Sequence, residues 1–360
     1  MTADMTAASG GTGPAGQVQA GRRAILHIGL HKTGTTYLQR CLFENIKALE
    51  DLGFFCPSPS GSRVVAAHNL AREVRKTRQF EPNGMLWHHV LPAFAASNAE
   101  TLLLTSECFD LSLPRHMARF RELLGSMEVT VLLCLRHPID LIQSMYSQIT
   151  KSERDDDFAA FVEHRVTKDN RLRFDRLHRQ WSKAFGAENV RVLFYEEIRD
   201  NLLEVFLREM GAEALLAKGA PRLPDARVIN ASADERLIAL RVACAARAKA
   251  TGMDPARYRD EIEPALLRLA TRRGWTDSKL KLVTPALAAR IEDACRPEIE
   301  ALNDRVPLPA SYFTFPANRD AATSPEDALI DGLADALLSG DLTVAGAARP
   351  SLLSRLLGRG

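Results

Sequence analysis

Apolar side chains occur along this chain in two distinct patterns. Four short runs, at residues 24–29, 101–106, 129–135 and 190–195, are mostly apolar and rich in aliphatic residues. Runs of this kind predict strands that are covered on both faces, as parallel strands are. The stretches between them carry apolar residues at helical spacing. The alternation predicts an α/β fold with a doubly wound parallel sheet flanked by helices.

The helical patterns differ in length and character. The apolar positions from Tyr37 to Leu49 predict one helix, and Phe174–Gly186 predicts an amphipathic helix that ends at its glycine. Residues 231–304 are mostly helical in pattern. A helix from Ala328 to Leu338 and a short one at 352–357 are expected in the remainder.

These patterns divide the chain into regions. Residues 1–21 lack a basic start and an apolar core, which predicts a disordered leader and not a signal peptide. Residues 22–230 predict a core with two insertions, 60–98 and 151–187, of the size that often shapes a binding pocket. Residues 231–306 predict a helical continuation of the same domain, and 307–360 a loosely patterned tail.

The segment Gly29–Thr36, directly after the first predicted strand, has the frame of a phosphate-binding loop. It reads Gly-Leu-His-Lys-Thr-Gly-Thr-Thr. Thr35 stands where a nucleoside-triphosphate loop has its lysine, and Lys32 lies inside the loop instead. A helix start offers unpaired N–H groups to an anion, and Gly34 permits a close backbone approach. An ordinary strand–helix corner would not need a lysine and three threonines, so the loop predicts an anion site that is not an ATP site.

A second motif follows the strand predicted at 129–135. Arg136 ends this strand, and Pro138 opens a helix that carries Ser144. Open α/β sheets bind ligands at the carboxyl ends of their strands, and an arginine there matches a phosphate bidentately. The alternative is an arginine neutralised by a neighbouring acid and a solvated serine. Beside the loop, the phosphate site is the better interpretation.

Together these motifs resemble the sulfotransferases that use 3′-phosphoadenosine 5′-phosphosulfate (PAPS). Lys32-Thr33-Gly34-Thr35-Thr36 is similar to the family's Lys-x-Gly-Thr-Thr loop, and His27–Gln39 looks like its bacterial branch. The spacing of Arg136 and Ser144 is similar to that of the family's second phosphate motif. Phe174–Gly186 and Ile229–Ser232 also resemble bacterial members. The resemblance covers roughly residues 22–240.

The resemblance implies a P-loop-type sheet as in sulfotransferases, PAPS as co-substrate and roles for individual residues. The loop residues Lys32, Thr33, Gly34, Thr35 and Thr36 would bind the 5′-phosphate end of the nucleotide. Arg136 and Ser144 would bind the 3′-phosphate, and Tyr195 would lie near the adenine, although packing on the sheet edge explains Tyr195 equally well. The family's second 3′-phosphate segment has no clear counterpart, and Arg222 and Arg227 are possible substitutes.

Sulfuryl transfer needs positive charge at the leaving phosphate, which Lys32 can supply, and a base for the acceptor hydroxyl. Glu107, at the end of the strand predicted at 101–106, is the first candidate, because several sulfotransferases carry a glutamate there. His31, in the loop, can be a base or a phosphate contact. His68 lies in the first insertion and is a candidate both for the base and for the acceptor pocket. Each has a structural alternative as an ion pair or packed side chain, and no metal site is expected.

Composition narrows the function further. The chain has 360 residues, a net charge of +2 and six cysteines without metal-ligand spacing. These numbers suit a cytoplasmic enzyme and disfavour strong nonspecific nucleic-acid binding. No stable membrane insertion is expected. Cys41, Cys134 and Cys244 are expected to be packed thiols.

Two other functions fit the same scaffold less well. A small-molecule kinase would need a lysine at position 35 and an acidic strand end for Mg²⁺. A non-catalytic nucleotide-binding protein would not need to keep Lys32 and every candidate base. The expected acceptor is a small molecule or carbohydrate with a hydroxyl or amine.

Overall fold

The computed structural model describes residues 21–58, 63–77, 86–151, 155–217, 221–223, 234–276, 280–318 and 327–339. These residues form two compact units. Unit 1 contains the described residues of 1–136 and 174–226, and unit 2 those of 137–173 and 227–360. The division into core, helical continuation and tail that the sequence suggests stays a prediction.

Unit 1 is an α/β unit built on a five-stranded parallel sheet of order β2-β3-β1-β4-β5. The strands are β1 (Arg23–Gly29), β2 (Phe54–Phe55), β3 (Thr101–Thr105), β4 (Glu128–Leu135) and β5 (Val190–Phe194). The flanking helices are α1 (Thr35–Glu44), α2 (Ile46–Asp51), α3 (His68–Arg75), α4 (Trp87–Ala96), η2 (Glu107–Leu111), α5 (Pro114–Leu124), α8 (Phe174–Phe185), η4 (Ala187–Asn189), α9 (Tyr195–Ile198), α10 (Leu202–Met210) and α11 (Ala214–Ala217). The predicted parallel α/β fold and its four strands are confirmed.

The strand order creates a switch point at the middle of the sheet. The chain leaves β1 toward β2 on one side, whereas it leaves the adjacent β4 toward β5 on the other. Ligands bind in open α/β sheets at such a point, outside the carboxyl ends of the strands. The carboxyl ends of β1, β3 and β4 meet there, with His27 opposite Thr105 and Gly29 opposite Cys134.

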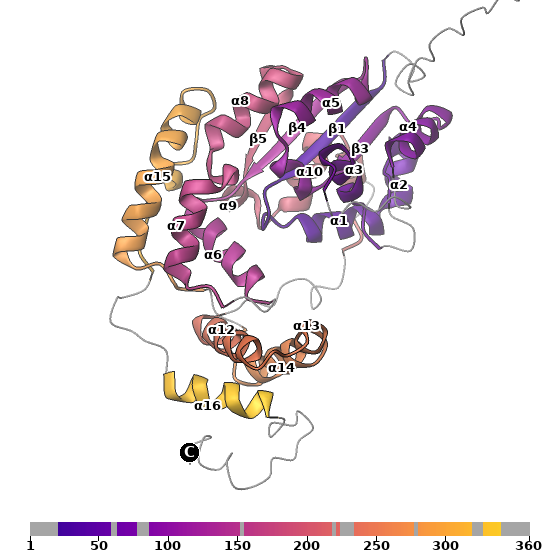
Figure 1. The fold of residues 1–360 in the computed structure, drawn as a ribbon. Coiled ribbons are helices and arrows are strands. Elements are labelled where there is room, and N and C mark those ends of the chain that lie inside the picture. Colours follow the sequence, from indigo (N-terminus) through magenta and orange to yellow (C-terminus); the bar gives the residue numbers. More distant parts are fainter. Residues whose placement is uncertain are drawn as a thin grey trace, which may run out of the picture. The chain divides into compact units, whose positions relative to one another are not determined.

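The sheet is covered by apolar side chains on both faces. Ile25, Leu103 and Leu132 share a buried cluster with Leu38 of α1 and Phe206 of α10. The opposite side carries α5 and α8, which lie side by side and pack on the sheet through α8 (Figure 1). This two-sided burial explains why the central strands are continuous apolar runs.

The helix predicted from Tyr37 to Leu49 is interrupted at Asn45. The side-chain Nδ2 of Asn45 donates 2.7 Å to the carbonyl of Cys41, and its backbone leaves the helical region at φ −111°. The chain therefore forms α1 and α2 instead of one helix. The same Asn45 side chain bonds the backbone of Arg222 in both directions, at 2.8 and 2.9 Å.

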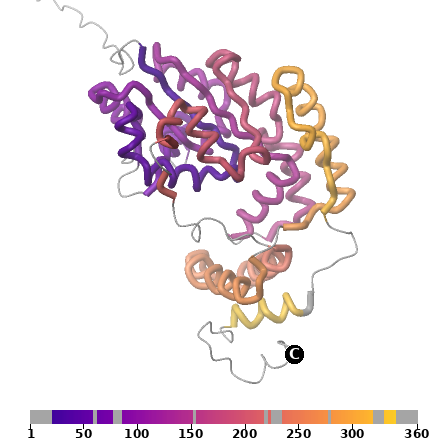
Figure 2. The backbone as a smooth tube through the Cα atoms, turned by 180° about the vertical axis from the view of Figure 1, so that it is seen from behind, coloured from indigo at the N-terminus to yellow at the C-terminus, as the bar shows by residue number. Residues whose placement is uncertain are grey.

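Unit 2 is helical in its described part, as the pattern of residues 231–304 predicted. Its helices are α6 (Pro138–Ile149), α7 (Phe158–Lys168), η3 (Asn170–Leu172), α12 (Glu235–Ala250), α13 (Pro255–Arg257), the π-helix η6 (Tyr258–Ile262), α14 (Glu263–Arg272), α15 (Pro285–Asn303), η7 (Ala310–Phe313) and α16 (Asp327–Leu338). Figure 2 shows α12 and α16 side by side, where Arg247 pairs with Asp331 and Asp335. The helices predicted at 174–186 and 328–338 are confirmed, whereas 352–357 lies outside the described residues.

Buried His27 on β1 makes the stability of unit 1 depend on pH. Its Nδ1 lies 2.8 Å from Thr105 Oγ1, and complete burial lowers its pKa from 6.5 to about 3. Between about pH 3 and pH 6.5 the His27 ring is therefore protonated in the unfolded chain and neutral in the folded chain. Stability should therefore fall as the pH falls from 6.5 toward 3, by up to about 1.4 kcal/mol per pH unit from this group.

Urea unfolding of the wild type and His27→Asn across this pH range measures the effect. The variant should show a flatter pH dependence, whatever its stability at neutral pH. Parallel curves for the two proteins would show that His27 does not titrate as its burial requires.

Candidate active site

The loop between β1 and α1 presents the uncapped start of a helix. Gly34 is the N-cap residue of α1, with φ 74° and ψ 12°, and no side chain makes a capping hydrogen bond there. The first turn of α1 contains no acidic residue. The N–H groups and the positive dipole end of α1 are therefore not neutralised by the helix's own side chains, and this favours an anion.

Lys32 adopts a backbone conformation that a side chain normally avoids. Its φ is 75°, which for a non-glycine residue costs on the order of 1–3 kcal/mol. The Nη1 of Arg136 donates to the Lys32 carbonyl over 2.5 Å, and the Leu30 N–H donates to the Cys134 carbonyl over 3.1 Å. The carboxyl end of β4 thus holds the loop in its strained shape. The strained residue lies two positions before Gly34, the N-cap of α1.

The threonines of the loop have different tasks. The hydroxyl of Thr33 is buried, donates to the Leu30 carbonyl over 2.8 Å and lies 3.5 Å from the hydroxyl of Thr35. A Cβ atom on Gly29 would come within 2.8 Å of the Thr35 hydroxyl oxygen. Thr33 and Thr35 therefore shape the interior of the loop around Gly29, whereas Thr36 is exposed in the first turn of α1.

Arg136 lies at the carboxyl end of β4 between the loop and an aromatic ring. Its guanidinium carbon is 5.2 Å from the ring centre of Tyr195, the first residue of α9. Its Nε is buried without a hydrogen-bond partner. Burial raises the pKa of Tyr195 although the positive charge of Arg136 opposes the shift. An arginine with an unused buried donor beside an uncapped helix start is suited to an anionic group.

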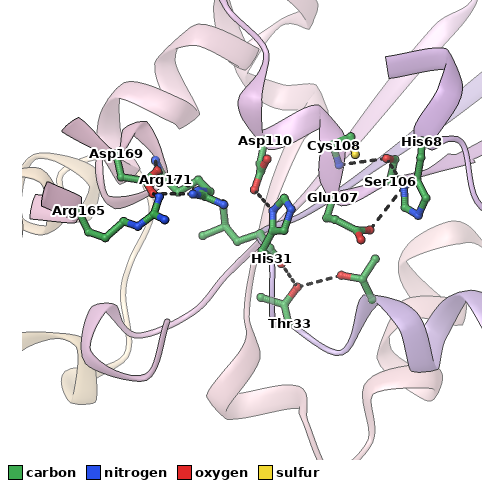
Figure 3. Close-up of polar contacts among 12 residues, drawn as sticks. His31, Thr33, His68, Ser106, Glu107, Cys108, Asp110, Arg165, Asp169 and Arg171 are labelled. Carbon is green, nitrogen blue, oxygen red and sulfur yellow. Dashed lines mark hydrogen bonds and ion pairs between the residues drawn. The ribbon is translucent and has the colours of Figure 1, made fainter. Parts of the chain in front are cut away.

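The carboxyl end of β3 brings a glutamate and a histidine together (Figure 3). Glu107 Oε2 lies 3.7 Å from Nδ1 of His68 and 3.4 Å from Nε2 of Gln39, which donates to it. His68 Nδ1 is also 2.7 Å from the Ser106 hydroxyl. Burial lowers the pKa of His68, the negative charge of Glu107 opposes this shift, and Arg72 and His31 add to it. His68 is thus favoured as a neutral ring.

A second histidine–carboxylate pair joins the loop to the same edge. His31 Nδ1 lies 2.8 Å from Oδ2 of Asp110 in η2. Figure 3 shows this pair next to Glu107. The pair links the segment after β1 to the segment after β3, which are neighbouring strands.

Most of the residues expected to act together are thus in one unit. Unit 1 contains all of the following, each shortly after the carboxyl end of a strand: His31, the loop from Lys32 to Thr36, Glu107, Arg136 and Tyr195. It also contains His68, the first residue of α3, which contacts η2. Ser144 is half-buried on α6 in unit 2, and its pairing with Arg136 stays a prediction. Arg222 is exposed, and Arg227 and Ile229–Ser232 lie outside the described residues.

The sequence analysis missed three site residues, Gln39, Ser106 and Asp110. Gln39 lies on α1 and contacts Glu107 across 68 sequence positions, and Asp110 meets His31 across 79. The spacing of residues within a short segment does not predict contacts between such distant positions. One property of the sequence was available, because Ser106 is the last residue of the strand predicted at 101–106 and Asp110 follows that strand closely, at the edge where ligands bind.

The described residues also bear on metals and membranes. They contain no group of three or more His, Cys, Asp or Glu side chains that could hold a metal ion. Over the same part of the chain, every helix is too short or too polar to cross a lipid bilayer.

Comparisons with known proteins give one structural match of note. No family model matches this chain, and no curated protein does. Among solved structures, the chain is similar to a sulfotransferase from Alicyclobacillus acidocaldarius, with 15% sequence identity and a TM-score of 0.41. The match covers 81% of this chain and 98% of that chain. No residue role is carried over from it.

Gly34 offers a direct test of the loop geometry. A Cβ atom there would lie 2.6 Å from Cδ2 of Leu202, and φ is 74°. Gly211 has the same φ, but its Cβ would meet only Arg23, at 3.6 Å. Gly211→Ala should therefore cost about 1–2 kcal/mol for the left-handed backbone alone. Gly34→Ala should cost about 1–3 kcal/mol more, because Leu202 must move.

Denaturant unfolding of both variants measures the difference. Equal losses in the free energy of unfolding for Gly34→Ala and Gly211→Ala would mean that Leu202 does not lie as close to Gly34 as in the structure.

Proposed function

We propose that this protein is a sulfotransferase that moves a sulfuryl group from PAPS to a hydroxyl or amine of a small-molecule or carbohydrate acceptor. The observation that carries the proposal is the contact between Arg136 and the Lys32 carbonyl. It joins the end of β4 to the loop at the switch point of the sheet, so that the buried unused donor of Arg136 lies beside a loop that contains Lys32 and an uncapped helix start. Two separate phosphate groups on one nucleotide match such a pair.

Each part of the nucleotide has a candidate partner. Lys32 and the backbone N–H groups from Thr33 to Thr36 suit the 5′-phosphate end. Arg136, with Ser144 eight positions later, suits the 3′-phosphate. Tyr195 supplies an aromatic face beside the loop, since the ring lies 3.4 Å from the position of a Cβ on Gly34. Adenine stacking on this face is the role we assign to it.

The chemistry requires three tasks of the protein. The loop holds the phosphosulfate in line with the acceptor, which contributes through proximity. Lys32 stabilises the negative charge that grows on the bridging oxygen as its bond to sulfur breaks. Glu107 takes the proton of the acceptor hydroxyl as the acceptor oxygen bonds to sulfur. The products are the sulfated acceptor and adenosine 3′,5′-bisphosphate.

Gln39 and His68 position the carboxylate that we assign as the base. Gln39 donates to Glu107 Oε2, and His68 lies against the same oxygen. These contacts restrict Oε2 and leave Oε1 as the proton-accepting atom. His68 belongs to α3, in the first of the two insertions, so its exposed face is available to the acceptor.

The nucleotide preference tests the proposal. The protein should bind adenosine 3′,5′-bisphosphate far more tightly than AMP, because only the former offers a group to Arg136. Arg136→Ala should remove about 1.5–3 kcal/mol of the difference, the value of a hydrogen bond to a charged group. Arg191→Ala, which removes an exposed arginine from β5, should leave the difference intact. Isothermal titration calorimetry measures the affinity of each of the three proteins for both nucleotides, and equal affinity of the wild type for both nucleotides would refute the proposal.

Glu107→Gln tests the assignment of the base. The amide keeps the shape but cannot accept the proton, so turnover should fall by about 10²–10⁴ with the nucleotide affinity nearly unchanged. Glu122→Gln, an exposed residue of α5, should be without effect. Full turnover in Glu107→Gln together with a collapse in His31→Ala or His68→Ala would make that histidine the base.

A further inference from the structure

Asp110 is a buried carboxylate with one unused oxygen. Its side chain is 0% exposed, Oδ2 is 2.8 Å from His31 Nδ1, and Oδ1 has no hydrogen-bond partner. Removing a carboxylate from water costs several kcal/mol unless its partners compensate. A single hydrogen bond to a neutral His31 ring does not compensate for the desolvation free energy of the Asp110 carboxylate. Stability alone therefore does not explain an aspartate at this position.

His31 is well placed to transmit the charge of Asp110 to the loop. It precedes Lys32 directly, between the Leu30 N–H bonded to Cys134 and the Lys32 carbonyl bonded to Arg136. Its side chain is 33% exposed. Because Nδ1 faces Asp110, the ring's Nε2 is the atom that remains for a ligand at this edge of the sheet.

We infer that Asp110 is a positioning residue that makes His31 a second cation of the anion loop, protonated when the nucleotide binds. In this form Nδ1–H donates to Asp110 and Nε2–H donates to an oxygen of the nucleotide's 5′-phosphate end. The proton comes from the solvent and is taken up on binding. The inference rests on the proposed function for the identity of the ligand, and it gives His31 the role of a phosphate contact while Glu107 remains the base.

The charged and titratable groups around His31 come from three segments. Asp110 and Glu107 of η2 are the carboxylates beside the ring, Lys32 follows it in the loop, and His68, Arg72 and Arg75 lie on α3. A bound phosphate adds negative charge on the Nε2 side, which favours the protonated form of a histidine.

Proton uptake is measured by titrating adenosine 3′,5′-bisphosphate into the protein in two buffers of different ionisation enthalpy. The measurement is made above the second pKa of a phosphate, about 6, where the ligand is fully charged. The wild type should take up a proton, and its affinity should fall by about 10-fold per pH unit as the pH rises.

Asp110→Asn keeps the shape and an acceptor for Nδ1–H but removes the charge. It should lose most of the proton uptake and about 10-fold or more in affinity, as expected for a charge-assisted hydrogen bond. His31→Gln cannot be protonated and should abolish the uptake, which gives a second test if Asp110→Asn does not fold. Asp175→Asn removes another buried carboxylate, paired with Arg179 on α8, and should behave as the wild type.

The outcomes separate the inference from the proposed function. Tight nucleotide binding with the same proton uptake in wild type, His31→Gln and Asp110→Asn would overturn the inference and leave the sulfotransferase proposal standing. Failure of the wild type to prefer the bisphosphate over AMP would remove the proposed function itself.

Discussion

The hydrogen bond from Arg136 to the carbonyl of Lys32 is the contact on which the candidate site depends. It connects the carboxyl end of β4 to the loop after β1 and holds Lys32 at φ 75°, where a lysine would not stay by its own preference. Through this bond the sheet fixes the loop and the loop fixes the start of α1. The strain is local, and the parallel pairing of β1 with β4 keeps the two ends at a constant distance.

Around this contact the carboxyl edge of the sheet is a polar layer on an apolar core. His27 and Thr105 form a buried pair across β1 and β3, and the next residues outward are Ser106, Glu107 and Asp110. Below them the same strands supply Ile25 and Leu103 to the core. β3 thus changes from apolar to polar after Leu104, so the side chains of Glu107 and Asp110 lie where they are mostly shielded from water. Such shielding strengthens electrostatic interactions between charged groups.

How much the sequence reveals depends on whether the information is local. The four longer strands are mostly apolar runs, and the loop is defined by a glycine and threonine pattern within eight residues, so both were predictable. β2 is only two residues long, Phe54–Phe55, and gives no periodicity. The division of one expected helix into α1 and α2 depends on the Asn45 side chain and its contact with Arg222, 177 positions away. The partners of His31 and Glu107 likewise come from distant segments.

The central claim is that the Lys32 loop serves transfer of a sulfuryl group. The most direct measurement incubates the full chain with isotopically labelled PAPS and pools of hydroxyl- and amine-bearing small molecules and carbohydrates, with mass spectrometry of the products. The account predicts a product that gains one labelled SO₃ group, formed by the wild type, strongly reduced in Lys32→Ala and insensitive to a metal chelator. A product that instead gains a phosphoryl group from ATP, in a reaction abolished by the chelator and restored by Mg²⁺, would contradict it.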